Sequence, residues 1–161
     1  MEIWDAYDEK MNRIEEKTLV RGQPIPDGQY HLVSEIIVKH LDGTYLVMQR
    51  DRKRSFGGKW EASAGGSALQ KEEPLDCAIR ELQEETGITA DDLKEIGRVI
   101  DHGHKTIYVE FLCVTGVDKN SILLQEGETS AYKWLACSEL REMPTDRWAR
   151  RRIFNFIDEL R

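Results

Sequence analysis

A dense run of acidic side chains on one predicted helix constrains this chain more than any other feature. Residues 65–88 read GGSALQKEEPLDCAIRELQEETGI. Proline is favoured at the first position of a helix, and glycine is favoured just beyond its end. Pro74 and Gly87 therefore predict a helix over residues 74–86.

Three glutamates crowd into about one and a half turns of that helix: Glu81, Glu84 and Glu85. Like charges three or four residues apart repel, at a cost of about 0.2–0.5 kcal/mol per pair. Oxygen ligands suit Mg²⁺, which proteins hold with a few carboxylates together with substrate phosphates. Because the apolar residues of the helix gather on another side, the carboxylates are predicted to face the preceding polar loop and to converge on such an ion. The predicted apolar side is Leu75, Ala78, Ile79 and Leu82.

The composition is that of an ordinary globular protein, and we predict a single domain over residues 1–161. A net charge of −7 argues against a general nucleic-acid binder, so no stable nucleic-acid complex is expected. The longest apolar runs are too short for a membrane span. The N-terminus lacks a basic-then-apolar signal pattern, which predicts a cytoplasmic protein. Its three scattered cysteines form no metal-binding pair and are interpreted as reduced thiols.

Alternating apolar residues and turn residues predict a mixed α/β chain. A small hairpin is predicted over residues 2–16, followed by a loop over 18–29 that is rich in proline and glycine. A long polar loop is predicted over residues 51–73, and such loops in compact domains are often functional. The other predicted strands cover residues 30–39, 44–50, 95–101, 106–114 and 132–136.

Two more helices are predicted near the C-terminus, over residues 138–143 and 145–161. The second begins at Thr145 as its cap and is amphipathic. Its apolar stripe is interpreted as core, with a partner surface as the alternative. The stripe consists of Ala149, Ile153, Phe156, Ile157 and Leu160.

The spacing of residues around the acidic helix matches a known motif. Gly66, Glu72 and the segment RELQEETGI, which begins at Arg80, occupy the defining positions of the Nudix box, here residues 66–88. The flanking segments GGKWEASAGG and EGETSAYKWLACSEL extend the likeness over about residues 30–140. The chain therefore resembles MutT-like Nudix hydrolases. This resemblance implies a Nudix fold, an α/β/α sandwich around a mixed β-sheet, with the N-terminal hairpin added to it.

The same resemblance implies metal-dependent attack of water on a diphosphate. By the family pattern, the ligands of Mg²⁺ (or Mn²⁺) are Glu81, Glu84 and Glu85, joined by the backbone carbonyl of Gly65. Bound metal neutralises charge on the diphosphate and lowers the pKa of a coordinated water. Arg80 is predicted to orient a carboxylate of the box.

Two candidates for the general base stay open. Some family members use a glutamate of the box, here Glu81 or Glu84, and others use a glutamate on a distant loop. Glu128, six residues before Trp134, matches that distant position.

The long loop before the box supplies candidate contacts to substrate. Arg50 and Arg52 belong to a cationic cluster placed where phosphates would arrive. Trp60 could stack on a base or pack beneath the loop, and His31 could be a polar contact near the site.

The N-terminal third and the segment KWEASAGGSAL resemble one subgroup especially, the isopentenyl-diphosphate isomerases and the isomerase-like bacterial Nudix hydrolases. The isomerases carry a catalytic cysteine where this chain has Gly65, and a histidine where it has Ser67. Hydrolysis is therefore predicted, with an isomerase or a catalytically silent binding module as alternatives. The expected partner is a small-molecule diphosphate, by family default a nucleoside diphosphate linked to another moiety. Assembly as a homodimer is left open.

Overall fold

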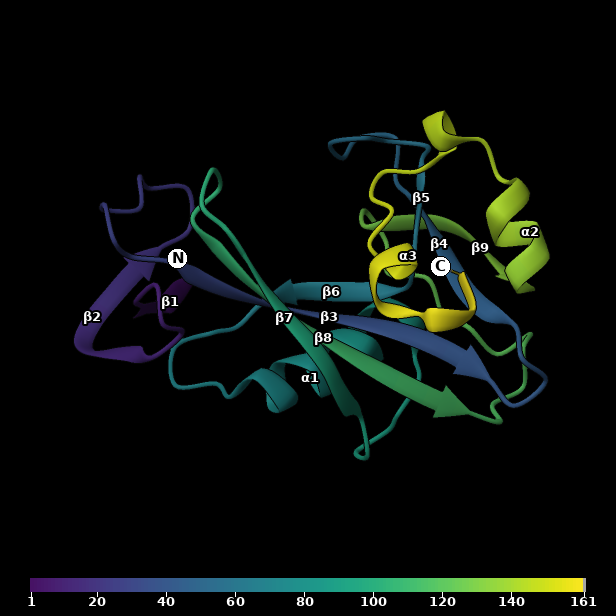
Figure 1. Cartoon of the computed structure of the whole chain (residues 1–161), viewed down its shortest axis with the longest axis horizontal. Coiled ribbons are helices and arrows are strands. Elements are labelled where there is room, and N and C mark those ends of the chain that lie inside the picture. Colours follow the sequence, from purple (N-terminus) through teal and green to yellow (C-terminus); the bar gives the residue numbers. More distant parts are fainter. Residues whose placement is uncertain (161) are drawn as a thin grey trace.

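Helices lie on both sides of a large mixed sheet, and a two-stranded sheet extends from one end of it (Figure 1). The computed structural model describes residues 1–160. The strands are β1 (Ile3–Tyr7), β2 (Arg13–Val20), β3 (His31–His40), β4 (Tyr45–Arg50), β5 (Trp60–Glu61), β6 (Ala64–Ser67), β7 (Lys94–Asp101), β8 (Thr106–Thr115) and β9 (Thr129–Leu135). The helices are α1 (Pro74–Thr86), α2 (Cys137–Glu142) and α3 (Ile153–Phe156), with single 3₁₀ turns at Thr145–Arg147 and Asp158–Leu160. This architecture confirms the predicted α/β sandwich.

The N-terminal hairpin is present as the antiparallel pair β1–β2 and has a small core of its own. That core includes Trp4 and Leu19, both buried. β2 continues to Val20, so the loop predicted to begin at residue 18 starts later than expected. The reason is packing, because Leu19 must reach the core of the hairpin.

β3 is the central strand of the larger sheet. It runs parallel to β8 over ten residue pairs, and its first half also pairs with β6. Near its end, Lys39 pairs instead with Tyr45 of β4. β4 in turn pairs with β5 and β9. The sheet therefore branches where the pairing of β3 changes from β6 to β4.

Helix α1 covers one face of this sheet and has the predicted bounds. Gly87 ends it in the left-handed conformation, with φ of 76°, which favours glycine. The buried side differs from the prediction: Ala78 and Leu82 are buried as expected, but Leu75 is 38% exposed, whereas Cys77 and Thr86 are fully buried. Ser34 of β3 faces this helix and donates a hydrogen bond of 2.7 Å to the Pro74 carbonyl.

The long loop predicted over residues 51–73 is interrupted by two short strands, β5 and β6. β6 consists of the sequence AGGS and pairs with β3. No strand was predicted there, because glycine and alanine are depleted in strands.

The predicted C-terminal helix over residues 145–161 is wrong for the described part of the segment, which holds only short turns and the four-residue α3. Trp148 and Ala149 run beside β5, where the Ala149 N–H donates to the Trp60 carbonyl at 2.8 Å. Those contacts and the burial of Arg152 against the sheet exclude a continuous helix. Ile153, Ile157 and Leu160 still reach the core as predicted. Residue 161 lies outside the described part.

Across residues 1–160, no helix has the length and apolar character needed to cross a membrane.

A buried ionic network joins this C-terminal segment to the sheet. Arg152 Nε lies 2.5 Å from Glu35 Oε2 on β3, and its Nη1 lies 2.5 Å from Glu110 Oε1 on β8. Arg150 Nη1 also reaches Glu35, at 3.1 Å from Oε1. The two carboxylates are 6% and 0% exposed, so their stability in the fold depends on the arginines.

We expect Arg152→Met to lower the free energy of unfolding at neutral pH by about 3–5 kcal/mol, because it leaves the buried Glu110 carboxylate unpaired and Glu35 paired with Arg150 alone. Burial already raises the pKa of Glu110 above its ordinary value. Without the charge of Arg152, the pKa of Glu110 in the folded variant rises further. The folded variant therefore binds this proton more strongly than the unfolded variant does, and its free energy of unfolding recovers as the pH falls. Urea denaturation at about pH 5 and pH 7.5 measures this. Arg98→Met, at an exposed ion pair with Glu95, is the matched control. A loss of equal size at both pH values would contradict the expectation.

Candidate active site

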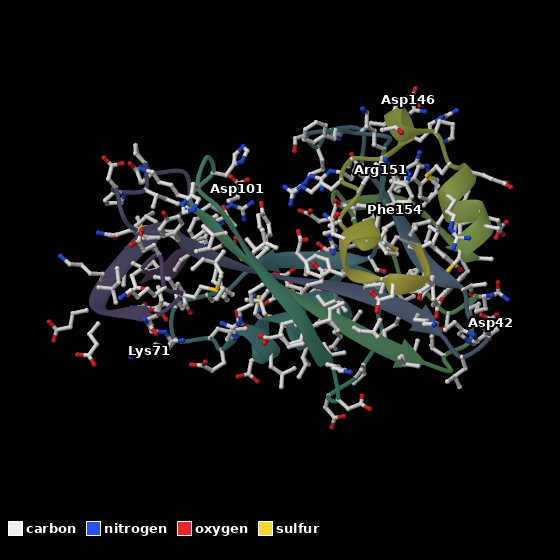
Figure 2. All side chains as sticks on the ribbon, viewed as in Figure 1. Asp42, Lys71, Asp101, Asp146, Arg151 and Phe154 are labelled. Atoms are coloured by element: carbon white, nitrogen blue, oxygen red, sulfur yellow. The ribbon has the colours of Figure 1, made fainter. Side chains whose placement is uncertain are left out.

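A large cavity of about 920 Å³ lies on the face of the larger sheet opposite α1. Alternate residues of β3, β8 and β7 form its floor, and the C-terminal segment and the loop after β4 form its walls. In Figure 2, Asp101 marks the end of this floor at the β7–β8 turn. The floor residues are His31, Val33, Glu35, Thr106, Tyr108, Glu110, Val99 and Asp101.

The glutamates of α1 reach this cavity around the edge of the sheet at β6. The Gly65 N–H donates to Glu85 Oε2 at 3.2 Å. A Cβ atom at Gly66 would collide with the Glu81 carboxylate, and one at Gly65 would lie 2.9 Å from the Ser34 carbonyl oxygen. Gly66 therefore leaves room for the Glu81 carboxylate of α1 beside β6, and Gly65 allows β6 to lie close to β3.

Arg80 holds three carboxylates of the box together. Its Nε and Nη2 bind the two oxygens of Glu72 at 2.7 and 2.8 Å, and its Nη1 lies 2.6 Å from Glu81 Oε1. Nη1 is also 3.4 Å from Glu84 Oε2. Burial alone would raise the pKa of Glu72, but the bonds from Arg80 and the Leu69 N–H lower it. Arg80 thus has the contacts of a residue that orients carboxylates.

Glu85 also belongs to this acidic group, but no arginine among the described residues neutralises its carboxylate. Burial raises its pKa to about 8, and the nearby charge of Glu81 contributes in the same direction. The Gly65 N–H acts against this shift, whereas Glu61 and Glu128 add to it. Burial likewise raises the pKa of Glu81. The cavity therefore concentrates negative charge that a cation would stabilise.

The chemistry of these donors fits a hard divalent cation, which takes carboxylate oxygens as ligands. Within residues 1–160, however, no three acidic, histidine or cysteine side chains surround a common point. Glu81 Oε1 is turned toward Arg80, and Glu85 Oε2 accepts from the amide of Gly65. Holding an ion there requires both carboxylates to turn, and the excess negative charge favours that change.

The other predicted residues are divided between the cavity and its surroundings. Arg50 lines the cavity and pairs with Glu61 at 2.6 Å. Glu128 also lines it and pairs with Arg54 at 2.9 Å. Arg52 is exposed and does not line the cavity.

Trp60 and His31 have different surroundings. Trp60 does not line the cavity, so its predicted contact with substrate is corrected: the ring is buried in the core, with Lys133 Nζ 4.9 Å from its centroid. His31 does line the cavity and stacks on Trp4, with ring centroids 4.5 Å apart. Burial lowers the pKa of His31, which favours the neutral ring.

Sequence reasoning missed the polar residues on the cavity floor and on the C-terminal wall. Glu35 stands within LVSEIIV and Glu110 within IYVEFLCV. A charged residue inside an apolar strand is a usable signal, because charges are almost never fully buried without a partner. Arg152, their partner, carried no comparable signal within a run of three arginines.

Solved structures of similar fold define the class. The Deinococcus radiodurans protein DR0079 superimposes with a TM-score of 0.76 over 96% of each chain, at 15% identity. A MutT protein from Methanosarcina mazei gives a TM-score of 0.59 at 24% identity, over 72% of this chain and 83% of the other. The fold is that of the MutT proteins.

Sequence comparison gives the family. A family model described as the NUDIX domain matches residues 30–156, and the chain belongs to the Nudix family. A Nudix hydrolase from Listeria innocua is 36% identical over 145 residues, which cover 89% of this chain and 85% of that protein. The Nudix hydrolase YfcD of Escherichia coli K12 is 32% identical over 113 residues, or 68% of this chain and 61% of the relative. The protein is a Nudix hydrolase.

We expect Glu85→Gln to stabilise the metal-free protein at alkaline pH. The folded-state pKa of Glu85, about 8, exceeds its ordinary value of 4.5, so wild type loses stability as the pH rises through that interval. Glutamine has no such proton. With a chelator present, the melting temperatures should agree near pH 5, and that of the variant should be higher near pH 9. Equal melting temperatures near pH 9 would show that the Glu85 carboxylate is not under electrostatic strain.

Proposed function

We propose that the protein is a divalent-metal-dependent hydrolase of a diphosphate linkage, with a nucleoside diphosphate linked to another moiety as its substrate. In this proposal Glu81, Glu84 and Glu85 hold Mg²⁺ (or Mn²⁺), and the carbonyl of Gly65 joins them. A bound divalent cation would stabilise charge on the diphosphate oxygens and lower the pKa of an attacking water.

The observation that carries the proposal is the unneutralised acid cluster around Glu85. Its pKa is raised by burial first and then by Glu81, with Glu61 and Glu128 contributing. Carboxylates placed together at the edge of a cavity lose stability unless a cation binds there. The Nudix domain of Shewanella oneidensis NrtR, which has a similar fold at 18% identity, was solved with ADP ribose, a ligand of the proposed class.

In the proposed mechanism, three arginines at the cavity position the reactants. Arg80 fixes the Glu72 and Glu81 carboxylates through its hydrogen bonds. Arg50, the last residue of β4, and Arg54, in the loop after it, line the same cavity, where they can bind phosphate oxygens. Each of these two arginines forms an ion pair with one carboxylate. Substrate binding would therefore replace that carboxylate with a phosphate as the partner of the arginine.

Glu128 and the box glutamates Glu81 and Glu84 are the candidates for accepting the proton of the attacking water. Glu128 is supported by its place on the cavity and by its influence on the pKa of Glu85. Arg54 would then orient Glu128. Comparison of the pH–rate profiles of Glu128→Gln, Glu84→Gln and Glu81→Gln distinguishes the candidates, because loss of the base removes the acidic limb.

The substrate class is tested with Mg²⁺ and a panel of nucleotide sugars, dinucleotides, nucleoside triphosphates and prenyl diphosphates. Monophosphate products are measured by phosphorus NMR. Hydrolysis of a nucleoside diphosphate derivative supports the proposal. Metal-independent turnover, or turnover confined to prenyl diphosphates, would overturn it.

Glu85→Gln is expected to lower turnover by at least about 100-fold at saturating Mg²⁺, since it removes a charged ligand that stabilises the transition state. Mg²⁺ should raise the melting temperature of the wild type, because the ion binds the folded chain. The variant should show a smaller rise. Glu95→Gln, on the exposed side of β7, is the matched control. Near wild-type turnover in Glu85→Gln would remove that residue from the metal site.

Heavy-oxygen water separates hydrolysis from isomerisation. Hydrolysis should place the label in one phosphate product, because water is the nucleophile. Isomerisation requires proton transfer to carbon, and Gly65 stands where the related isomerases carry a cysteine. We expect no deuterium in isopentenyl diphosphate recovered from deuterated buffer. Metal-dependent deuterium incorporation would establish isomerase activity instead.

A further inference from the structure

The loop after β4 holds an aromatic side chain that the core does not cover. Phe56 is 58% exposed, and of residues 1–160 it is the one phenylalanine, tyrosine or tryptophan that is exposed. It belongs to none of the hydrophobic clusters of the described chain, and it lines the cavity of the candidate active site. Packing of the fold therefore does not account for an aromatic ring at this position.

The backbone holds Phe56 in an unfavourable conformation. Its φ is 56°, in the left-handed region that a bulky side chain rarely adopts. Such conformations persist only where the surrounding structure imposes them, and they cluster at functional sites. Glycine would adopt the same backbone conformation without strain. A phenylalanine at this position therefore indicates that the ring itself is used.

Hydrogen bonds within the loop fix the position of Phe56. Arg50 Nε donates to the Ser55 carbonyl at 2.7 Å, and its Nη2 lies 3.3 Å from Ser55 Oγ. The Gly58 N–H donates to the Arg50 carbonyl at 2.9 Å, and the Lys59 N–H donates to the Phe56 carbonyl at 3.2 Å. The loop is thus tied to the end of β4 on both sides of Phe56, and it presents the ring to the cavity in an ordered setting.

Phe56 lies next to a cation that can bind phosphate. Arg54 stands two residues before it, so their Cα atoms are at most about 7 Å apart. Arg54 pairs with Glu128 at 2.9 Å, and both residues line the cavity. The pKa of Glu85 is raised by burial first, with Glu128 among the charges that add to the shift, so this pair lies near the acid cluster. A phosphate held between Arg54 and that cluster would have its next attached group within reach of the Phe56 ring.

We propose that Phe56 is the surface on which the planar base of a nucleoside diphosphate substrate stacks. Every base has a π-face, and stacking on an aromatic side chain is a common way for proteins to hold one. Arg50 and Arg54 then bind the phosphates on the same wall of the cavity. The placement of these phosphates rests on the proposed function.

The surroundings of Phe56 favour a base over a prenyl chain. The cavity wall beside the ring carries the charged side chains Arg50, Arg54 and Glu128. A prenyl chain is apolar on all sides, so it would desolvate these charges and offer them no hydrogen bond. A base has a flat face for Phe56 and a polar edge for the neighbouring side chains. Phe56 therefore determines specificity in this proposal and takes no part in the chemical step.

The test compares the binding of AMP and ribose 5-phosphate, which differ in the adenine base and contain no diphosphate to be cleaved. Each is titrated into the Mg²⁺-loaded full chain and followed by NMR. Wild type should bind AMP about tenfold more tightly, because stacking on an aromatic side chain gives affinity of that order. Phe56→Ala should bring the ratio of the two affinities close to one, and Phe56→Trp should preserve it.

A second variant separates recognition from a structural role of the ring. Phe56→Gly relieves the left-handed strain, so its melting temperature should exceed that of Phe56→Ala by about 2–4 °C. Both variants should lose the preference for AMP. A ring that only supported the loop would give the opposite result, with lower melting temperatures than wild type in both variants and an unchanged preference.

Leu41→Ala is the matched control, because it removes an exposed apolar side chain outside the cavity and should leave both affinities unchanged. The proposal is overturned if wild type shows no preference for AMP, or if the preference survives in folded Phe56→Ala. A preference that depends on Phe56, without hydrolysis of any nucleoside diphosphate derivative, would reject the proposed function and leave the base subsite standing. Hydrolysis of such derivatives without a preference for AMP would reject the subsite alone.

Discussion

The close approach of helix α1 to the β6 edge is the constraint on which the site depends. Gly66 leaves the Glu81 carboxylate the space that any Cβ atom would fill. A Cβ atom at Gly65 would lie 2.9 Å from the Ser34 carbonyl oxygen of β3, so this glycine keeps β6 close to β3, and its N–H donates to Glu85. A helix on the far face of the sheet can thereby place acidic side chains beside a cavity on the near face. A side chain at Gly66 would displace the Glu81 carboxylate from its position beside β6.

Charge balance then divides the acidic residues into two kinds. Arg80 binds Glu72 and Glu81 through short hydrogen bonds and offsets part of their charge. Glu85 has only a backbone amide, and burial holds its pKa at about 8. Crowding of glutamates on one helix therefore disfavours the ionised form of Glu85, a cost to stability of the kind that is expected at functional sites.

The sequence predicted the parts of the site that local rules determine. Pro74 and Gly87 bounded α1 because helix ends have their own residue preferences. The strand β6 escaped prediction because two glycines there serve close packing rather than strand propensity. The likeness to the isomerase-like subgroup stays a prediction. Trp60 was misplaced because an aromatic residue in a polar loop can face either way, and only tertiary packing selects the core.

The C-terminal segment was the largest error, and its cause lies in contacts between distant parts of the chain. Its apolar spacing favours a helix, but Arg152 is drawn into the sheet by Glu35 and Glu110, which lie on strands far earlier in the sequence. Non-local ion pairing of this kind overrides helix propensity, which is a weak prior. The same pairing brings Arg150 over Tyr108 and builds the cavity wall opposite the box. A complete motif can thus identify the family of this protein, whereas the rest of its cavity is built by residues that no local pattern reveals.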